Sequence, residues 1–404
     1  MTDVVITGVG VVSAAGPTFS DLASALSAGR GCATPYKTPL PLDEVAAVPT
    51  HVEPFPGFQD DRKAWLAMHA LEEALGDAGG TGEGRVSVFL GTGLSSVTPS
   101  ELNEDAYPHL NREMTAFDRD SLCADLNADG ASPWRHDPVR VTSAVAQRVG
   151  ATGPCGTSFS ACSAAAQAIA EGLRTIRRGE ADVAIVGGHD SMLHPFGLLS
   201  FIVLGALSPT ACRPFDPNRD GFLIGEGAAI LVLESAAHAA ARGARVRARL
   251  LGAGTSVDGY AATAPHPDGA GAEQAMRAAL LDAGIKAEDV DYVNAHATGT
   301  PVGDTAEAAA ISRVTPHAPV SSIKGAVGHT IAAAGAIEAA ACIAALEGGW
   351  MPGTVGLTEV DAACPVNVLK DTAQQAPKIV LSNSFGFGGQ NAAIVLAHAE
   401  VNHV

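Results

Sequence analysis

Hydrophobic positions along the chain fall into short continuous runs and longer helical repeats. The opening "MTDVVITGVG" predicts a strand from the third residue, and "VSVFLGTG" and "VDYVNAHATGT" predict two further strands, each preceded by a helical pattern. Two Ala-rich stretches, residues 162–178 and 329–347, predict long helices because glycines stand directly after them. The pattern therefore predicts strands that alternate with helices.

Segments of the first part of the chain recur in the second part. "LEEALGDAG" (71–79) resembles "MRAALLDAG" (276–284), and "GFLIGEGAAILVLE" (221–234) resembles "FGFGGQNAAIVLAH" (385–398). Two copies of one strand and helix order predict a layered α/β protein whose helices cover buried sheets. We expect one half over residues 1–243 and the other over 244–404. Residues 95–140 are polar and weakly periodic, which indicates a cap or dimer-interface excursion.

Composition and charge exclude several classes of protein. The chain has no continuous apolar run of the roughly 18 residues that a membrane helix needs, and its first residues lack the basic flank of a signal peptide, so we expect a cytoplasmic protein that does not bind a membrane. Its seven cysteines are scattered and show no metal-binding spacing, so no metal is expected. A net charge of −18 argues against nucleic acid as a partner.

Cys162 lies in "SFSACSAAAQAIAEG" (158–172), where a serine-rich turn precedes a helical pattern. At a helix N-terminus, unpaired N–H groups and the helix dipole lower the pKa of a thiol and favour an oxyanion. Taken alone, however, a cysteine in an Ala-rich helix is more often a small packing residue.

Two histidines complete a candidate reactive set. His296 follows an apolar strand in "NAHATGTPVGD" (294–304), although a buried structural histidine is an equal alternative there. His329 stands just before the second Ala-rich helix, at the position that corresponds to Cys162 in the first half, so the duplication predicts that the two helix starts meet. A cysteine with two imidazoles is suited to covalent acyl transfer, whereas clustered metal-ligand spacing is missing.

Two other features accompany this set. Lys324 and Glu338 flank His329, and we interpret them as a buried ion pair with a structural role. In "SNSFGFGGQN" (382–391), glycines around Phe387 allow the backbone to approach a ligand closely, although a plain turn is the alternative.

These motifs together resemble the β-ketoacyl-acyl carrier protein synthases, and most closely the elongating type II condensing enzymes. The segments that carry the resemblance are "VVITGVGVVSAAG", "SACSAAAQA", "GEADVAIVGGHDSML", "RPFDPNRDGFLIGEGAAILVLE", "NAHATGTPVGD", "SSIKGAVGH" and "SNSFGFGGQN". The resemblance implies a thiolase-like fold, with two duplicated α/β halves in a five-layered αβαβα arrangement, and an obligate dimer.

The resemblance also implies a role for each candidate residue. Cys162 would accept an acyl group from the phosphopantetheine of an acyl carrier protein, with no other cofactor, and His296 and His329 would support decarboxylative condensation with a malonyl thioester. Cys162 and Phe387 would form the oxyanion hole and gate, and Phe201 would line the acyl pocket. The supporting residues would be Lys324, Glu338, Thr298 and Thr300.

Some features leave the substrate and the partner open. The wording "SFSACSAAA" and the segment "GASPWRHDPVRVTSAVAQRVG" depart from fatty acid enzymes, which favours a polyketide or specialised fatty acid pathway. The condensing enzyme would form a homodimer or a heterodimer with a ketosynthase-like subunit. The alternatives to it are a non-decarboxylating acyltransferase on the same fold and a silent, chain-length-factor-like subunit of a ketosynthase heterodimer. A coenzyme A thiolase is more distant, because it needs a late cysteine in another context. An acidic carrier protein requires a local basic patch, for which the candidates are Arg62 and Lys63, with Arg174, Arg177 and Arg178 as further possibilities.

Overall fold

The computed structural model describes residues 2–36, 45–58, 61–93, 107–111, 113, 115–127 and 137–401. Its main sheet has the strand order β10-β9-β11-β12-β8-β1-β7-β6-β4-β5. The strands of the first half are β1 (Val4–Val12), β4 (Val86–Thr92), β5 (Cys155–Ser158), β6 (Val183–Ser191) and β7 (Ile224–Ser235). Those of the second half are β8 (Ala248–Val257), β9 (Tyr292–Asn294), β10 (Val320–Ser321), β11 (Ile379–Gly386) and β12 (Gln390–His398).

The strand order confirms the predicted duplication. The first half runs β5-β4-β6-β7-β1 and the second runs β10-β9-β11-β12-β8. In each half the first three strands pair in parallel and the next two pairings are antiparallel. The halves join where β1 pairs with β8, through Val5 opposite Arg249 and Ile6 opposite Ala248.

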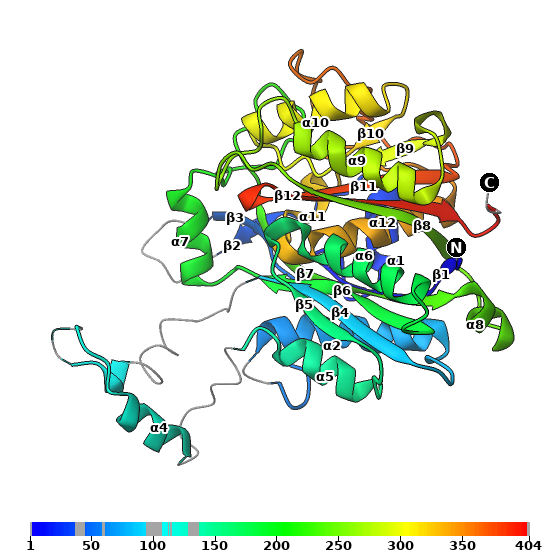
Figure 1. Cartoon of the computed structure of the whole chain (residues 1–404). Helices are drawn as coiled ribbons and strands as arrows, with labels where there is room; N and C mark the ends of the chain where they lie inside the picture. Colours follow the sequence, from blue (N-terminus) through cyan, green and yellow to red (C-terminus); the bar gives the residue numbers. More distant parts are fainter. Residues whose placement is uncertain are drawn as a thin grey trace.

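The helices form the remaining layers of a five-layered arrangement (Figure 1). On the outer faces lie α2 (Arg62–Ala78) and α5 (Arg140–Arg148) in the first half, and α9 (Ala270–Ala283) and α10 (Pro301–Val314) in the second. Between the two halves lie α6 (Ala164–Arg177) and α12 (Ala334–Gly348). Shorter described elements complete the chain: α1 (Phe19–Ser27), β2 (Thr34–Tyr36), β3 (Val45–Val48), α7 (Pro195–Val203), α8 (Ala236–Ala241) and α11 (Lys324–Val327).

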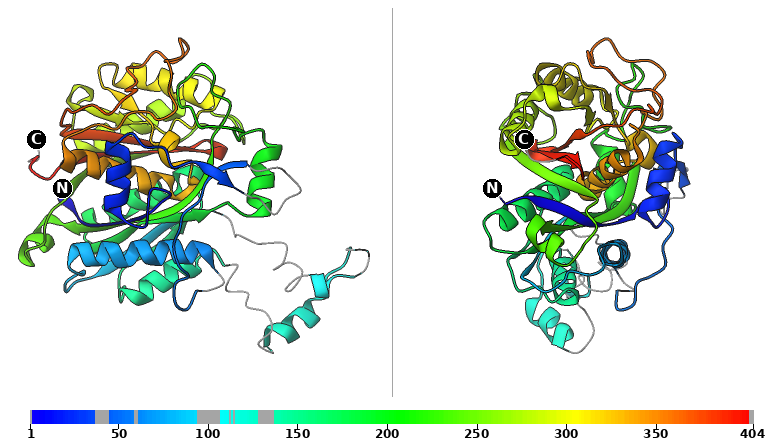
Figure 2. Two further views of the ribbon diagram at one scale, coloured as in Figure 1. Left: turned by 180° about the vertical axis from the view of Figure 1, so that it is seen from behind. Right: turned by 90° about the vertical axis from the view of Figure 1, so that its right-hand side faces the viewer.

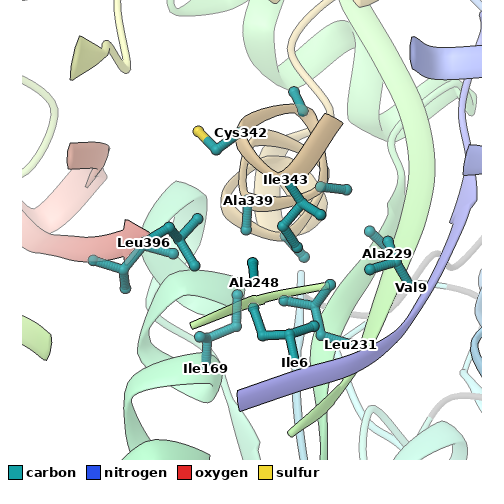
Figure 3. Packing of buried hydrophobic residues seen from close by; sticks show 14 of the residues in the cluster. Ile6, Val9, Ile169, Ala229, Leu231, Ala248, Ala339, Cys342, Ile343 and Leu396 are labelled. Carbon is teal, nitrogen blue, oxygen red and sulfur yellow. The ribbon is translucent and has the colours of Figure 1, made fainter. Parts of the chain in front are cut away.

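The two central helices pack closely because small residues face each other. A Cβ added at Gly335 of α12 would lie 2.9 Å from the backbone nitrogen of Ala166 in α6. Ala339 and Ile343 of α12 pack against Ile169 of α6 (Figure 3). They also pack against Ile6 of β1 and Leu396 of β12, one from each half of the main sheet. Side chains from both halves therefore share one core.

The segment Ile331–Gly348 is apolar and long enough to cross a membrane, although the sequence analysis found no such run. It is 89% buried inside the protein. Its hydrophobicity follows from its position between the two halves of the main sheet, where every face of a helix meets apolar neighbours.

Part of the predicted excursion over residues 95–140 lies outside the described residues, namely 95–106, 112, 114 and 128–136. Its described elements are η2 (Tyr107–His109) and α4 (Arg119–Asn127), which pack on each other beside the main body (Figures 1 and 2). Its role as a cap or dimer interface stays a prediction.

The contact between β1 and α2 gives a test of the layer packing. A Cβ at Gly10 of β1 would overlap the carbonyl oxygen of Ala70 in α2 and lie 2.6 Å from the nitrogen of Ala74. A Cβ at Gly76 of α2, in contrast, meets nothing within 4 Å. We expect Gly10→Ala to lower the free energy of unfolding by about 1–3 kcal/mol. Gly76→Ala should leave it unchanged or raise it by up to about 1 kcal/mol. Urea unfolding followed by circular dichroism measures both, and equal effects would contradict the packing.

Candidate active site between the two halves

Cys162 lies on a strained turn directly before α6. The 3-10 helix η4 (Ala161–Ser163) contains it, and Ala161 has a φ of 48°, which is unfavourable for a residue with a side chain. Ser163 holds this turn, since its hydroxyl donates to the carbonyl of Ser160 at 2.8 Å and accepts from the Gln167 amide at 3.1 Å. The turn therefore delivers both the thiol and the backbone N–H of Cys162 to the start of the helix.

The second half repeats this turn, but with a different residue at the equivalent position. Ile331 also has a φ of 48° and opens the 3-10 helix η6 (Ile331–Ala333) before α12. The structural counterpart of Cys162 is therefore Ala332, and the predicted correspondence with His329 is wrong by three residues. The sequence showed the helix but not the strained turn that sets its start.

The backbone of His329 pairs with the start of β7. Its N–H donates to the carbonyl of Leu223 at 2.9 Å, and its carbonyl accepts from the N–H of Gly225 at 3.0 Å. Anchored in this way, Nε2 of His329 lies 3.1 Å from Sγ of Cys162. The prediction that the two helix starts meet therefore holds, although the two residues are not equivalent.

His296 completes the set. It follows β9, and its ring centroid lies 5.4 Å from that of His329 at an interplanar angle of 84°. The sulfur and one nitrogen of each ring all lie within 4.8 Å of one another. The structure thus brings together the three residues that the sequence singled out.

Lys324 and Glu338 form a buried ion pair beside the histidines. Nζ of Lys324 also lies 3.4 Å from Nδ1 of His296. An ammonium group only donates, so Nδ1 accepts and the ring proton resides on Nε2. The pair thereby fixes His296 as a hydrogen-bond donor toward the site.

Burial keeps the reactive groups uncharged. Desolvation, reinforced by the positive charge of Lys324, holds the pKa of His296 and of His329 well below the usual range. Burial also raises the pKa of the Cys162 thiol to about 12, opposite to the shift expected at a helix start. The charge of Lys324 and the N–H of Phe387 favour the thiolate but do not outweigh desolvation. The thiol proton is therefore released only with an acceptor in contact, and Nε2 of His329 is in that position.

The turn around Phe387 supplies a second backbone donor. Its N–H donates to the sulfur of Cys162, and the adjoining Gly386 packs against the Cys162 backbone nitrogen. Gly388 and Gly389 have φ values of 81° and 72°, which side chains disfavour. The N–H of Phe387 and the backbone nitrogen of Cys162 thus lie side by side next to the sulfur, where they can together bind the oxyanion of a thioester attacked by that sulfur.

Aromatic rings line one side of the site. The centroid of Phe201 lies 6.5 Å from that of Phe387 and 5.4 Å from that of Phe222, which packs edge-on against His329. The three reactive residues line a cavity of about 340 Å³ together with these rings and with Thr298 and Thr300, whose hydroxyls lie 3.0 Å apart.

Two buried acids of α10 were missed by the sequence analysis. Glu307 accepts from the backbone N–H of His296 at 2.9 Å, and Asp304 accepts from that of Gly299 at 3.1 Å. Burial raises the pKa of Glu307 to about 7 and that of Asp304 to about 6. Both fix the loop that carries His296. Their spacing of three residues near the start of a helix was the available signal.

The burial of Lys63 contradicts its predicted place in a carrier docking patch, whereas the side chain of Arg62 is 35% exposed. Lys63 is only 6% exposed, and its Nζ lies 3.0 Å from Oδ1 of Asp190. Nε of Arg62 donates to the buried Glu226 at 2.7 Å. Both cations therefore neutralise carboxylates of the core.

The other proposed docking arginines are also paired with carboxylates. Arg177 pairs with Asp282 at 2.8 Å. Arg174 and Arg178 both pair with Glu171, and Arg178 also pairs with Glu180. These contacts leave little net positive charge at the end of α6.

The cysteine and the two histidines are close enough together to be metal ligands. The ammonium group of Lys324 lies beside His296, however, and repels a divalent cation at the same place. The charge distribution therefore favours organic chemistry over metal binding.

Comparison with known proteins was made on the sequence and on the fold. The family model of the beta-ketoacyl synthase N-terminal domain matches residues 1–239, and that of the C-terminal domain matches residues 247–358. The chain is 35% identical over 365 residues to a 3-oxoacyl-[acyl-carrier-protein] synthase 2 of Staphylococcus aureus, covering 87% of this chain and 85% of that one. It is 38% identical over 368 residues to nodulation protein E of Rhizobium meliloti, covering 89% and 87%.

Solved structures agree with these relatives. The ishigamide ketosynthase/chain length factor superposes with a TM-score of 0.81 at 33% identity, covering 98% of this chain and 99% of that one. A beta-ketoacyl synthase of Burkholderia phymatum superposes with a TM-score of 0.85 at 31% identity, covering 99% and 100%. A type II polyketide acyl-carrier protein bound to its ketosynthase gives a TM-score of 0.87 at 27% identity, covering 98% and 100%. The predicted thiolase-like fold is confirmed.

The buried ion pair gives a test of the site's electrostatics. Lys324→Met leaves the Glu338 carboxylate buried without its counter-charge, so we expect the free energy of unfolding to fall by about 3–5 kcal/mol. Lys324→Met combined with Glu338→Leu removes both charges and should recover most of that loss. Urea unfolding of the single and double variants measures this, and a double variant as unstable as the single one would contradict it.

Proposed function

The chain belongs to the β-ketoacyl synthase family, and on that premise we propose that it elongates acyl chains as a β-ketoacyl-acyl carrier protein synthase. It is then an acyltransferase whose acyl group arrives on the phosphopantetheine of an acyl carrier protein, without a further cofactor. The observation that carries the proposal is the buried thiol of Cys162 at 3.1 Å from Nε2 of His329, with His296 in the same cavity.

The first step transfers the acyl group to the enzyme. As the thiol attacks the thioester carbonyl, its proton passes to Nε2 of His329, and the N–H groups of Cys162 and Phe387 stabilise the developing oxyanion. The carbon–sulfur bond of the substrate then breaks, and the departing phosphopantetheine thiolate takes the proton from His329. The enzyme is left with an acyl group on Cys162 and a neutral imidazole.

The second step generates a carbon nucleophile from a malonyl thioester. Loss of carbon dioxide leaves its electron pair as an enolate, whose charge develops on the thioester oxygen. His296 donates to that oxygen from Nε2, because Lys324 occupies Nδ1. After the first step the neutral imidazole of His329 carries its proton on Nδ1, so Nε2 of His329 donates to the same oxygen once that proton has moved from Nδ1 to Nε2 by exchange with water.

The third step forms the new carbon–carbon bond. The enolate carbon attacks the acyl carbonyl on Cys162, the same two N–H groups bind the oxyanion, and the bond to sulfur breaks as the intermediate collapses. The Cys162 thiolate takes a proton from Nε2 of His329, which is in turn reprotonated by solvent, and the product is a β-ketoacyl chain on the carrier, longer by the two carbons that malonyl retains.

The cavity mouth supports apolar contact with the carrier protein. Leu204 and Val302 line the cavity and are 48% and 56% exposed, and Val203, next to Leu204, is 78% exposed. No lysine or arginine stands among the described residues that line the cavity, whereas Asp220 and Asp258 do. We therefore place the docking site of the carrier on this apolar rim instead of on Arg62 and Lys63.

The partner and pathway follow from the relatives. One similar solved structure is a ketosynthase with its carrier protein, and others pair a ketosynthase with a chain length factor. We propose a polyketide or specialised fatty acid pathway in the cytoplasm, with a second ketosynthase-like subunit, identical or not, as dimer partner. A silent chain-length-factor role is less well supported, because Cys162, His296 and His329 stand together in reactive geometry.

Half-reactions on carrier-bound substrates distinguish a condensing enzyme from a non-decarboxylating acyltransferase and from a silent subunit. We expect intact-mass spectrometry to show an acyl adduct that Cys162→Ala abolishes. His329→Ala should lower carbon dioxide release from malonyl-acyl carrier protein at least a hundredfold, the scale of a lost catalytic donor. Unchanged elongation by His329→Ala indicates a non-decarboxylating acyltransferase. Full activity of an assembled complex that carries Cys162→Ala indicates a silent subunit.

The apolar rim predicts an unusual response to salt. Binding of the carrier should change by less than about threefold between 50 and 500 mM NaCl, because few exposed ion pairs form at the interface. Val203→Asp should weaken binding at least tenfold, since it places a charge in an apolar contact. Leu281→Asp, at an exposed apolar residue of α9 that does not line the cavity, is the matched control. Steep loss of binding with salt would instead indicate a basic docking surface.

A further inference from the structure

The two strained helix starts differ in what occupies their backbone N–H groups. At the first, the N–H of Phe387 contacts the reactive sulfur, and we assign it with the N–H of Cys162 to a substrate oxyanion. At the second, the N–H of Ala332 donates to Oδ2 of Asp190 at 3.1 Å. A carboxylate of the chain itself therefore takes the place at the second helix start that an oxyanion takes at the first.

Several contacts hold the carboxylate of Asp190 in the position where it accepts from the N–H of Ala332. It lies at the end of β6, fully buried, and its Oδ1 accepts from the N–H of Ser191 at 2.9 Å and pairs with Lys63 at 3.0 Å. A Cβ at Gly93 would lie 2.5 Å from Oδ2, so the glycine leaves room for the carboxylate. A buried ion pair contributes little net stability compared with apolar residues of the same size. Stability alone does not explain why a charge stands here.

The position of Ala332 suggests the reason, because it lies three residues after His329. The other side of this short loop is fixed by the hydrogen bonds of His329 with Leu223 and Gly225. The unfavourable φ of Ile331 lies between the two anchors, and a strained turn persists only where its surroundings hold it. Without the contact from Asp190, one end of the loop that carries His329 is released.

We propose that Asp190, neutralised by Lys63, is a positioning residue for His329. Its carboxylate caps the second helix start and holds the imidazole at the distance from Cys162 that decarboxylation and condensation need. Asp190 touches neither substrate nor sulfur in this role. The inference rests on the proposed function, since its readout is the malonyl half-reaction.

Two double variants separate the cap from the charge. Lys63→Met with Asp190→Asn removes the ion pair but keeps a side-chain oxygen for the N–H of Ala332. Lys63→Met with Asp190→Leu removes the ion pair and the acceptor, while the leucine keeps the number and branching of the side-chain heavy atoms of Asp190. Both should fold, because neither variant leaves a buried charge without its partner.

Carbon dioxide release from malonyl-acyl carrier protein and the extent of Cys162 acylation are measured for both variants. We expect the Asn variant to release carbon dioxide at least tenfold faster than the Leu variant, because small displacements of a catalytic group cost large factors in rate. The extent of Cys162 acylation should be complete in both, which shows that the first helix start is intact.

The matched control is Glu234→Gln, which disrupts another fully buried carboxylate, paired with Arg242. It should lower stability without changing carbon dioxide release. Equal rates in the two double variants, or an equal loss in Glu234→Gln, would overturn the proposal. Wild-type protein that acylates Cys162 but releases no carbon dioxide would instead refute the proposed condensing function.

Discussion

The close packing of α6 against α12 is the constraint on which the rest of the structure depends. The two halves of the main sheet cover these helices on both sides, so the interface between the helices admits only small side chains, such as Ala166 and Gly335. Close approach brings the two helix starts together, and with them Cys162 and His329, from distant parts of the chain. The buried position of α12, which accounts for its membrane-like hydrophobicity, also keeps water away from the site.

Dry surroundings decide the electrostatics of the site. One ammonium group, Lys324, is paired with Glu338 and touches His296, and desolvation keeps both imidazoles neutral and the thiol protonated. Neutral imidazoles donate hydrogen bonds to an enolate oxygen without surrendering their protons to it. In such a site the thiol of Cys162 stays protonated until a thioester binds.

The sequence predicted the features that depend on local pattern and on order. Glycines after the Ala-rich runs marked the ends of α6 and α12, and the recurring segments predicted the duplicated halves. Features that depend on distant pairing were not visible: Arg62 and Lys63 appeared as a surface patch because their partners, Glu226 and Asp190, lie more than a hundred residues away in the chain. The strained φ values at Ala161 and Ile331 leave no signature in residue type, so the equivalence of Cys162 with Ala332 needed the structure.

The duplicated turn has a consequence for the symmetry of the molecule. A fold that repeats itself offers two equivalent helix starts, and in principle two reactive centres that would compete for one pool of intermediates. In this chain one start carries a thiol and the other carries alanine with its N–H already engaged by a carboxylate. The pseudo-twofold axis of the backbone is thus broken at the level of single side chains, and each polypeptide is left with one place where a growing chain can be attached.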